Sequence, residues 1–160
     1  MKQKTAFDIL KTGKNIFLTG SAGTGKTFIL KKYIKYLKER GIQPAVIAPT
    51  GIAASHLNGV TVHSFFALGI RDNIDDYFLD NLLQKKYLHN RFSKLKVILI
   101  DEISMVSLKI FNSIDKILRA FKFSDKPFGG VQIIVSGDFF QLPPVCKNNE
   151  IKKFSWQSSS

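Results

Sequence analysis

The residues with the clearest chemical potential form a glycine-rich loop near the amino terminus. Residues 20–27 read GSAGTGKT and follow the largely apolar segment 15–19. The pattern G-x-x-x-x-G-K-S/T between a strand and a helix is typical of a phosphate-binding loop, because backbone N–H groups and a helix dipole converge on an anion. Lys26 is predicted to contact the β- and γ-phosphates of a bound nucleotide, and the Thr27 hydroxyl to bind Mg²⁺. The predicted nucleotide-binding residues are Gly20, Ser21, Ala22, Gly23, Thr24, Gly25, Lys26 and Thr27.

A second group of candidates follows an apolar strand. Residues 97–102 read VILIDE. Asp101 is predicted to hold Mg²⁺ through the coordination shell of the ion. Glu102 is predicted to polarise a water for in-line attack on the γ-phosphorus. A chance glycine turn and two exposed acids at a strand end are the alternatives, but the occurrence of both motifs in one chain argues against them.

Gln141 is a third candidate, beyond a further apolar strand. Its amide can hydrogen-bond both the γ-phosphate and the attacking water, so its contacts would change on hydrolysis. A glutamine before two prolines could equally have a purely structural role in the loop, and the residues alone leave both interpretations open.

Short apolar segments and helical patterns alternate along the chain. Continuously apolar strands separated by helices indicate an α/β fold with a parallel sheet covered by helices on both faces. Ligands bind at the carboxyl ends of such strands, and the phosphate loop, Thr50, Asp101, Glu102 and Asp138 all fall there. The predicted strands are 15–19, 45–48, 97–100 and 131–135; the predicted helices are 6–10, one that follows the loop and ends at Gly41, 52–57, most of 70–95, and 103–123.

Composition narrows the class of protein. The 160 residues suit one domain, and the formal net charge of +12 favours either a nucleic-acid partner or merely a lysine-rich solvated surface. Cys146 is the only cysteine, so an intrachain disulfide is impossible. No apolar run is long enough to span a membrane, and the first residues lack the apolar centre of a signal peptide. We expect an intracellular protein, cytoplasmic if bacterial and nuclear or mitochondrial if eukaryotic.

Four segments together resemble the first motor lobe of Pif-type DNA helicases, in the RecD-like branch of superfamily one. They read NIFLTGSAGTGKT (15–27), APTGIAASHLNGVTVHSFF (48–66), ILIDEISM (98–105) and PFGGVQIIVSGDFFQLPPV (127–145). The last segment discriminates best, since many unrelated ATPases share the first. The order and spacing of the four run through nearly the whole chain.

The resemblance implies a RecA-like P-loop NTPase lobe over residues 1–160, with ATP and Mg²⁺ as cofactors and single-stranded DNA as partner. It implies 5′–3′ movement along that DNA, and roles in DNA repair, recombination and telomere maintenance. Gln3 matches an adenine-reading glutamine and Gln141 a γ-phosphate sensor. The residues that match contacts to the DNA backbone are Thr50, Gly51, His63 and Ser64. For His63 alone, an ordinary structural histidine is the simpler interpretation.

The chain departs from the family because the second motor lobe is absent. That lobe supplies an arginine that stabilises charge on the transferring phosphoryl group, a contribution of ~10³–10⁵ in turnover. We therefore expect a fragment that binds ATP–Mg²⁺, hydrolyses it slowly and does not unwind duplex. The alternative is a lone nucleotide- or DNA-binding module without motor activity. A small-molecule kinase ranks last, because its arginine-rich lid would have to come from residues 70–95, which hold only Arg71 and Arg91.

Overall fold

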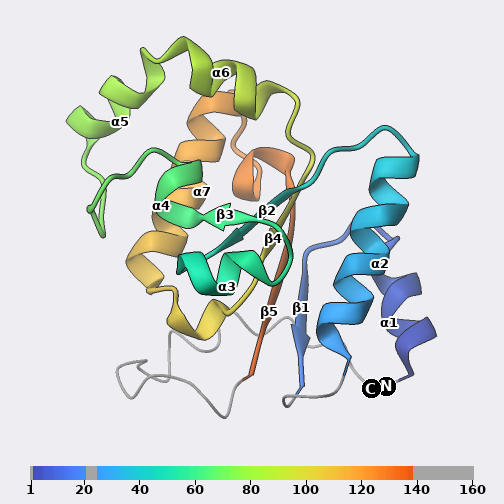
Figure 1. Cartoon of the computed structure of the whole chain (residues 1–160). Helices are drawn as coiled ribbons and strands as arrows, with labels where there is room; N and C mark the ends of the chain where they lie inside the picture. Colours follow the sequence, from blue (N-terminus) through green and yellow to red (C-terminus); the bar gives the residue numbers. More distant parts are fainter. Residues whose placement is uncertain (1, 21–24, 139–160) are drawn as a thin grey trace.

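A five-stranded parallel sheet organises the protein. The computed structural model describes residues 2–20 and 25–138 (Figure 1). The strands lie in the order β1-β5-β4-β2-β3, and every neighbouring pair is parallel. The predicted α/β fold is confirmed. The strands are β1 Ile16–Thr19, β2 Ala45–Ala48, β3 Val60–Thr61, β4 Val97–Ile100 and β5 Gln132–Gly137. The sequence pattern missed β3, because two residues are too few to show a periodicity.

The alternating side chains of the strands feed two separate cores. In β4, Ile98 and Ile100 pack on one face of the sheet, while Val97 and Leu99 pack on the other. All four are buried, which explains why the strand is apolar throughout rather than at every second residue.

Helices cover both faces (Figure 1). The face that carries Val97 and Leu99 is covered by α1 (Gln3–Leu10) and α2 (Lys26–Glu39). The face that carries Ile98 and Ile100 is covered by the helices from α4 to α7. The short α3 (Gly51–Ser55) packs Ala53 and Ala54 against Ala48 at the end of β2. The remaining helices are α4 Val62–Phe65, α5 Asp76–Leu83, α6 Lys86–Ser93, α7 Leu108–Lys122 and the 3₁₀ turn η2 Pro127–Gly130. In the described part of the chain, none of the helices combines the length and apolar character needed to cross a bilayer.

The long helix predicted over residues 103–123 is divided in two. A 3₁₀ turn, η1 (Ile103–Met105), comes first, and Val106 is extended with φ −94° and ψ 122°. The Ser107 hydroxyl then accepts a hydrogen bond from the Ile110 N–H at 3.2 Å and caps the start of α7. The expected boundary was wrong because a serine at this position favours a helix start over a helix interior.

The position of β5 decides which loops meet. β5 lies between β1 and β4, with Thr19 opposite Gly137 and Ile100 opposite Val135. The carboxyl ends of these three strands are therefore neighbours, although residues 19 and 137 are far apart in sequence. In Figure 1 they point downward, toward the same end of the sheet.

A buried polar network fixes the beginning of β5. The Tyr33 hydroxyl donates to Gln132 Oε1 at 3.0 Å. Gln132 Nε2 donates to the carbonyl oxygens of Leu10 and Lys14 at 3.2 and 2.8 Å. The side chain of one strand residue thus holds α2 and the turn between α1 and β1, and its buried polar atoms are satisfied.

Candidate nucleotide site

The glycine-rich segment lies between β1 and α2, where the phosphate-loop pattern predicts it. Gly20 follows β1, and Gly25 precedes α2 with φ 87° and ψ 16°, a left-handed conformation that glycine adopts without strain. A Cβ on residue 25 would also collide with Nε2 of Gln3. The predicted adenine-reading residue therefore lies against the loop. The predicted contacts at Ser21, Ala22, Gly23 and Thr24 fall outside the described residues.

Lys26 connects two neighbouring strand ends. Its half-buried ammonium donates to the carbonyl oxygen of Gly20, after β1, and to that of Gly137, at the end of β5, at 3.3 Å. It forms no ion pair with a carboxylate within residues 2–20 and 25–138. Its charge is therefore held at the carboxyl edge by neutral acceptors that a phosphate oxygen can replace.

Asp101 is fixed at the end of β4 by hydrogen bonds from both sides. Its backbone N–H donates to the Ile47 carbonyl oxygen at 2.9 Å. Its Oδ1 atom accepts from the Ser136 hydroxyl at 2.6 Å and from the Glu102 N–H at 3.0 Å. Oδ2 has no hydrogen-bond partner in the described part of the chain, so it can accept from a hydrated cation.

Ser136 is the residue that sequence reasoning missed. It is 1% exposed, and it immediately precedes Gly137, whose carbonyl oxygen holds Lys26. Its only signal in the sequence is a hydroxyl at the end of the apolar run 131–135. Two consecutive residues of β5 thus hold the predicted phosphate-binding lysine and the predicted metal-binding aspartate.

The residues at this edge fit Mg²⁺ bound together with phosphate. Among the residues that the structure describes, no three His, Cys, Asp or Glu side chains cluster, so an all-protein metal cage is absent there. Mg²⁺ usually takes one or two carboxylates and completes its octahedron with water and phosphate oxygens. Asp101 and the exposed Thr27 hydroxyl in the first turn of α2 are suitable protein ligands for such a shared site.

Glu102 stands in an unusual backbone conformation. Its φ of 54° and ψ of 46° are left-handed, a region that non-glycine residues occupy at a cost of about 1–3 kcal/mol. The conformation is stabilised by η1, in which the Met105 N–H donates to the Glu102 carbonyl oxygen at 3.0 Å. It turns the chain sharply after β4 and leaves the Glu102 side chain half-buried beside Asp101. Gln141, the predicted γ-phosphate sensor, lies outside the described residues.

Gly137 allows this turn to pack closely. A Cβ on residue 137 would stand 2.9 Å from Cγ2 of Ile103, the first residue of η1. A larger residue would push η1 away from β5, and Glu102 with it. The glycine therefore sets the distance between the Glu102 turn and the strand that holds Lys26.

The predicted DNA-contacting residues form two neighbouring groups at the same edge. Thr50 and Gly51 follow β2 and are exposed; Thr50 caps α3 by accepting from the Ala53 N–H at 3.2 Å. His63 and Ser64 follow β3, which pairs with β2. The His63 Nε2 atom donates to the Arg71 carbonyl oxygen at 3.1 Å, so this ring also has a structural contact.

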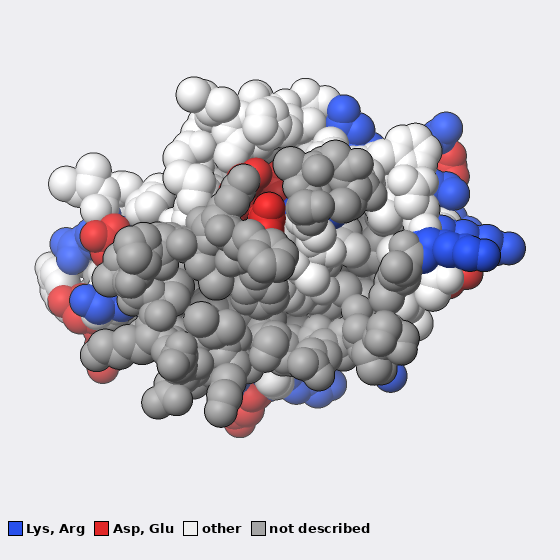
Figure 2. All heavy atoms as spheres, turned by 90° about the horizontal axis from the view of Figure 1, so that it is seen from below, with Lys and Arg blue, Asp and Glu red and all other residues white. Residues whose placement is uncertain are grey.

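The face at the carboxyl ends has carboxylates near its centre. Seen from below, acidic side chains are visible close to the middle of this face, while both acidic and basic side chains lie toward its edges (Figure 2). A polyphosphate at the centre of this edge therefore requires a cation between it and the acids. Lys26 and a divalent ion held by Asp101 meet that requirement.

Replacing Ser136 with alanine tests how Asp101 is positioned. We expect the Mg²⁺-dependent part of nucleotide affinity to fall roughly tenfold, because a hydrogen bond to a charged group contributes about 1.5–3 kcal/mol. Titrating a non-hydrolysable ATP analogue with and without Mg²⁺ measures this. Ser113→Ala is the control, because Ser113 is also buried but donates only to the Lys109 carbonyl oxygen. Equal losses with and without Mg²⁺ would mean that Ser136 does not act through the metal ligand.

Comparison with known proteins identifies the family. The family model for PIF1-like helicase matches residues 1–160. The chain is 51% identical to the ATP-dependent DNA helicase Pif1 of Psychrobacter sp. over 162 residues, which cover 100% of this chain and 25% of that protein.

Solved structures agree with this match. The Pif1 helicase of Candida albicans superposes with a TM-score of 0.80 at 37% identity, covering 92% of this chain and 34% of that one. The Bacteroides Pif1 helicase in complex with ADP-AlF3 and ssDNA gives a TM-score of 0.76 at 42% identity, covering 94% and 34%. The chain spans about a quarter of the length of the curated Psychrobacter relative. It belongs to the PIF1-like helicase family.

Proposed function

We propose that residues 1–160 form the RecA-like, ATP-binding motor lobe of a 5′–3′ DNA helicase, which couples ATP hydrolysis to movement on single-stranded DNA. The relatives are named ATP-dependent DNA helicases, and one Bacteroides relative was solved with ADP-AlF3 and ssDNA. In this proposal the chain binds ATP with Mg²⁺ at the ends of β1, β5 and β4, and DNA at the ends of β2 and β3.

One observation carries the proposal most directly. Lys26 and Asp101 are hydrogen-bonded to Gly137 and Ser136, which are consecutive residues of β5. A cation for phosphate and a ligand for Mg²⁺ are thereby held on either side of one strand end. This is the arrangement that binding a triphosphate with its metal requires.

The chemistry assigned to these residues is transfer of the γ-phosphoryl group to water. Lys26 offsets negative charge on the β- and γ-phosphates. Glu102 accepts a proton from the attacking water while the water oxygen forms a bond to the γ-phosphorus. The bond from phosphorus to the β,γ-bridging oxygen breaks, and ADP leaves. Mg²⁺, held by Thr27 and Asp101, supplies further charge stabilisation when bound. Gln141 remains the proposed γ-phosphate sensor.

The DNA site lies beside the nucleotide site on the same edge of the sheet. Ala48 pairs with Thr61, so the segments that follow β2 and β3 are adjacent. The Thr61 hydroxyl accepts from the Ser64 N–H at 3.1 Å and fixes the start of α4. Hydroxyl and backbone groups of this kind bind phosphates with little base preference.

In this proposal, catalysis by the chain alone is slow. We assign the charge-stabilising arginine of the transition state to a second motor lobe, as the resemblance implies. Within the described residues, Arg119 pairs with Asp115 at 2.9 Å on α7, and Arg91 donates to the Phe65 carbonyl oxygen at 2.6 Å. Neither arginine contacts the residues assigned to the nucleotide site.

The test titrates the purified 160-residue chain with oligo-dT at two salt concentrations and measures ATP turnover with and without DNA. We expect weak binding whose affinity falls steeply as salt rises, because phosphate contacts release counterions. Oligo-dT and mixed-sequence oligonucleotides should bind similarly. Strong DNA-stimulated hydrolysis or duplex unwinding would contradict the requirement for a second lobe. Salt-independent DNA binding would contradict the phosphate contacts.

A further inference from the structure

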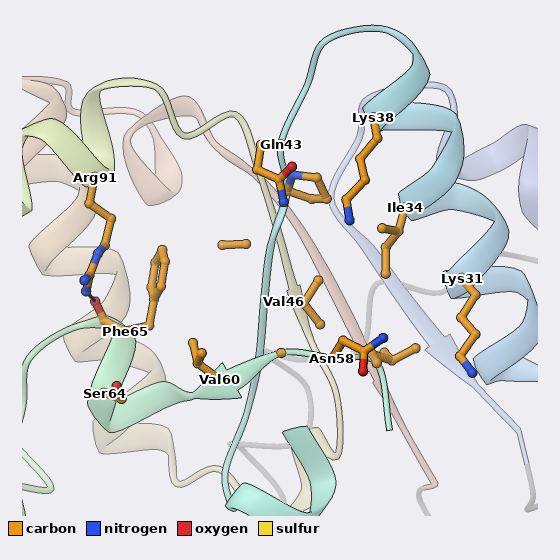
Figure 3. A pocket seen from close by; sticks show the side chains of 14 residues that line it. Lys31, Ile34, Lys38, Gln43, Val46, Asn58, Val60, Ser64, Phe65 and Arg91 are labelled. Carbon is orange, nitrogen blue, oxygen red and sulfur yellow. Dashed lines mark hydrogen bonds between the residues drawn. The ribbon is translucent and has the colours of Figure 1, made fainter. Parts of the chain in front are cut away.

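A groove runs along the outer edge of the sheet, away from the nucleotide site. It has a volume of about 540 Å³ and lies between α2, the β2–β3 edge and α6. Figure 3 shows side chains from these elements around it, with Lys31 and Lys38 on the α2 side and Arg91 on the opposite side. A second depression of about 410 Å³ shares Gln43, Pro44 and Ala45 with the first, so the two form one continuous surface.

The charge of this surface is one-sided. Lys31, Lys38 and Arg91 line the first depression, and Arg91, Lys94 and Lys96 line the second. None of the residues that line either one is acidic. Within residues 2–20 and 25–138, no carboxylate forms an ion pair with any of these five cations. Such a surface attracts a polyanion and repels a second copy of itself.

The arginine in the middle is held in place. Arg91 Nη1 donates to the Phe65 carbonyl oxygen at 2.6 Å. Its guanidinium carbon lies 5.3 Å from the centre of the Phe65 ring and 5.5 Å from that of Tyr87. A guanidinium ordered in this way loses less entropy when its other N–H groups bind a phosphate.

The lysines beyond Arg91 add to the positive potential. Burial lowers the pKa of Lys122, and the positive charge of Lys96 lowers it further. Lys122 donates to the carbonyl oxygens of Ser93 and Leu95 at 3.3 and 2.8 Å, on either side of Lys94. Lys122 is therefore a neighbour of Lys94 and Lys96 at the wall between α6 and β4, although Lys122 itself lines neither depression.

The backbone of the groove does not favour an added peptide strand. β3 already pairs with Ile47 and Ala48, which leaves only the first half of β2 open along its outer edge. Pro44, directly before β2, has no N–H to donate. An extended peptide would find too short a strand edge for pairing, whereas a phosphate chain needs cations rather than a strand edge.

We propose that this groove binds phosphates of the DNA strand after the strand leaves the carboxyl edge of the sheet. Ser64 connects the groove with the proposed DNA site, because it lines the groove and also belongs to the segment after β3 that is assigned to DNA binding. The inference rests on the proposed DNA binding and extends it to Lys31, Lys38 and Arg91. It predicts a longer contact than the ends of β2 and β3 alone would give.

The experiment compares two charge-matched pairs of substitutions in the full chain. Lys31→Gln with Lys38→Gln removes two groove cations, and Lys35→Gln with Lys109→Gln removes two exposed cations outside it. The oligo-dT must be long enough to extend beyond the carboxyl edge. For such DNA, we expect the variant with both groove substitutions (the groove pair) to bind roughly tenfold more weakly at low salt. The slope of log affinity against log salt should shrink by about 1.4, or ~0.7 for each lost phosphate contact. The control pair should change both values much less.

Further measurements separate the possible outcomes. Thermal unfolding and binding of an ATP analogue should be unchanged in both pairs. If both pairs lose affinity and slope equally, the groove proposal is overturned while DNA binding itself stands. If unmodified protein does not bind oligo-dT at low salt, both proposals fail. If labelled oligo-glutamate binds as tightly as oligo-dT, and only the Lys31→Gln/Lys38→Gln variant loses this binding, the partner is an acidic polypeptide instead.

Discussion

Lys26→Ala is expected to weaken ATP binding by a hundredfold or more. A charge-assisted contact to phosphate contributes about 1.5–3 kcal/mol, and Lys26 is predicted to make one to each of two phosphates. At 1.4 kcal/mol for each tenfold change, a loss of about 3 kcal/mol corresponds to roughly a hundredfold. Fluorescence titration with a labelled, non-hydrolysable ATP analogue measures the change.

Two comparisons make this result specific. Lys35→Ala removes an exposed lysine of the same helix α2 and should leave the affinity unchanged. Thermal unfolding shows whether loss of the contacts to Gly20 and Gly137 disturbs the fold. A folded Lys26→Ala protein with normal ATP affinity would refute the assignment of the nucleotide site.

Glu102→Gln is expected to leave nucleotide binding intact and to lower hydrolysis by ~10²–10⁴, the usual contribution of a general base. Glutamine has nearly the same shape, so the left-handed turn before η1 should persist. Its amide cannot accept the proton of the attacking water. The effect is best measured in a protein with both motor lobes, where turnover is fast enough to quantify a loss of this size.

The matched control is Glu39→Gln, which neutralises an exposed acid at the end of α2. It removes the same charge and should not alter turnover. If Glu102→Gln also hydrolyses ATP at the normal rate, another residue activates the water. A fall in nucleotide affinity would instead show that Glu102 supports binding rather than chemistry.

Short-range patterns in the sequence predicted four of the five strands and the residues of the candidate site. The apolar run before GSAGTGKT and the run before Asp101 indicated buried parallel strands, and both lie in the sheet. The pattern failed at residues 103–107, where a local cap at Ser107 outweighed helical spacing. It also missed β3, which is too short to carry a period.

Helical periodicity also did not reveal the groove between α2, β2 and α6. From the sequence, Lys31 and Lys38 are predicted to lie on a solvent-exposed helix face, where lysines of this spacing are usually found. Only tertiary structure places Arg91 opposite them (Figure 3) and leaves the surface without acids. The positive potential of this surface depends on which distant segments are neighbours, and that information is not local.

By itself the sequence determined the residue types, and it predicted the phosphate loop and the roles of Asp101 and Glu102, because these predictions depend on spacings of a few residues. Tertiary structure decided that β5 lies between β1 and β4, that Ser136 holds Asp101 and that Gly137 holds Lys26. Strand order follows from how whole layers pack and how their connections cross, and a single strand carries no record of its neighbours.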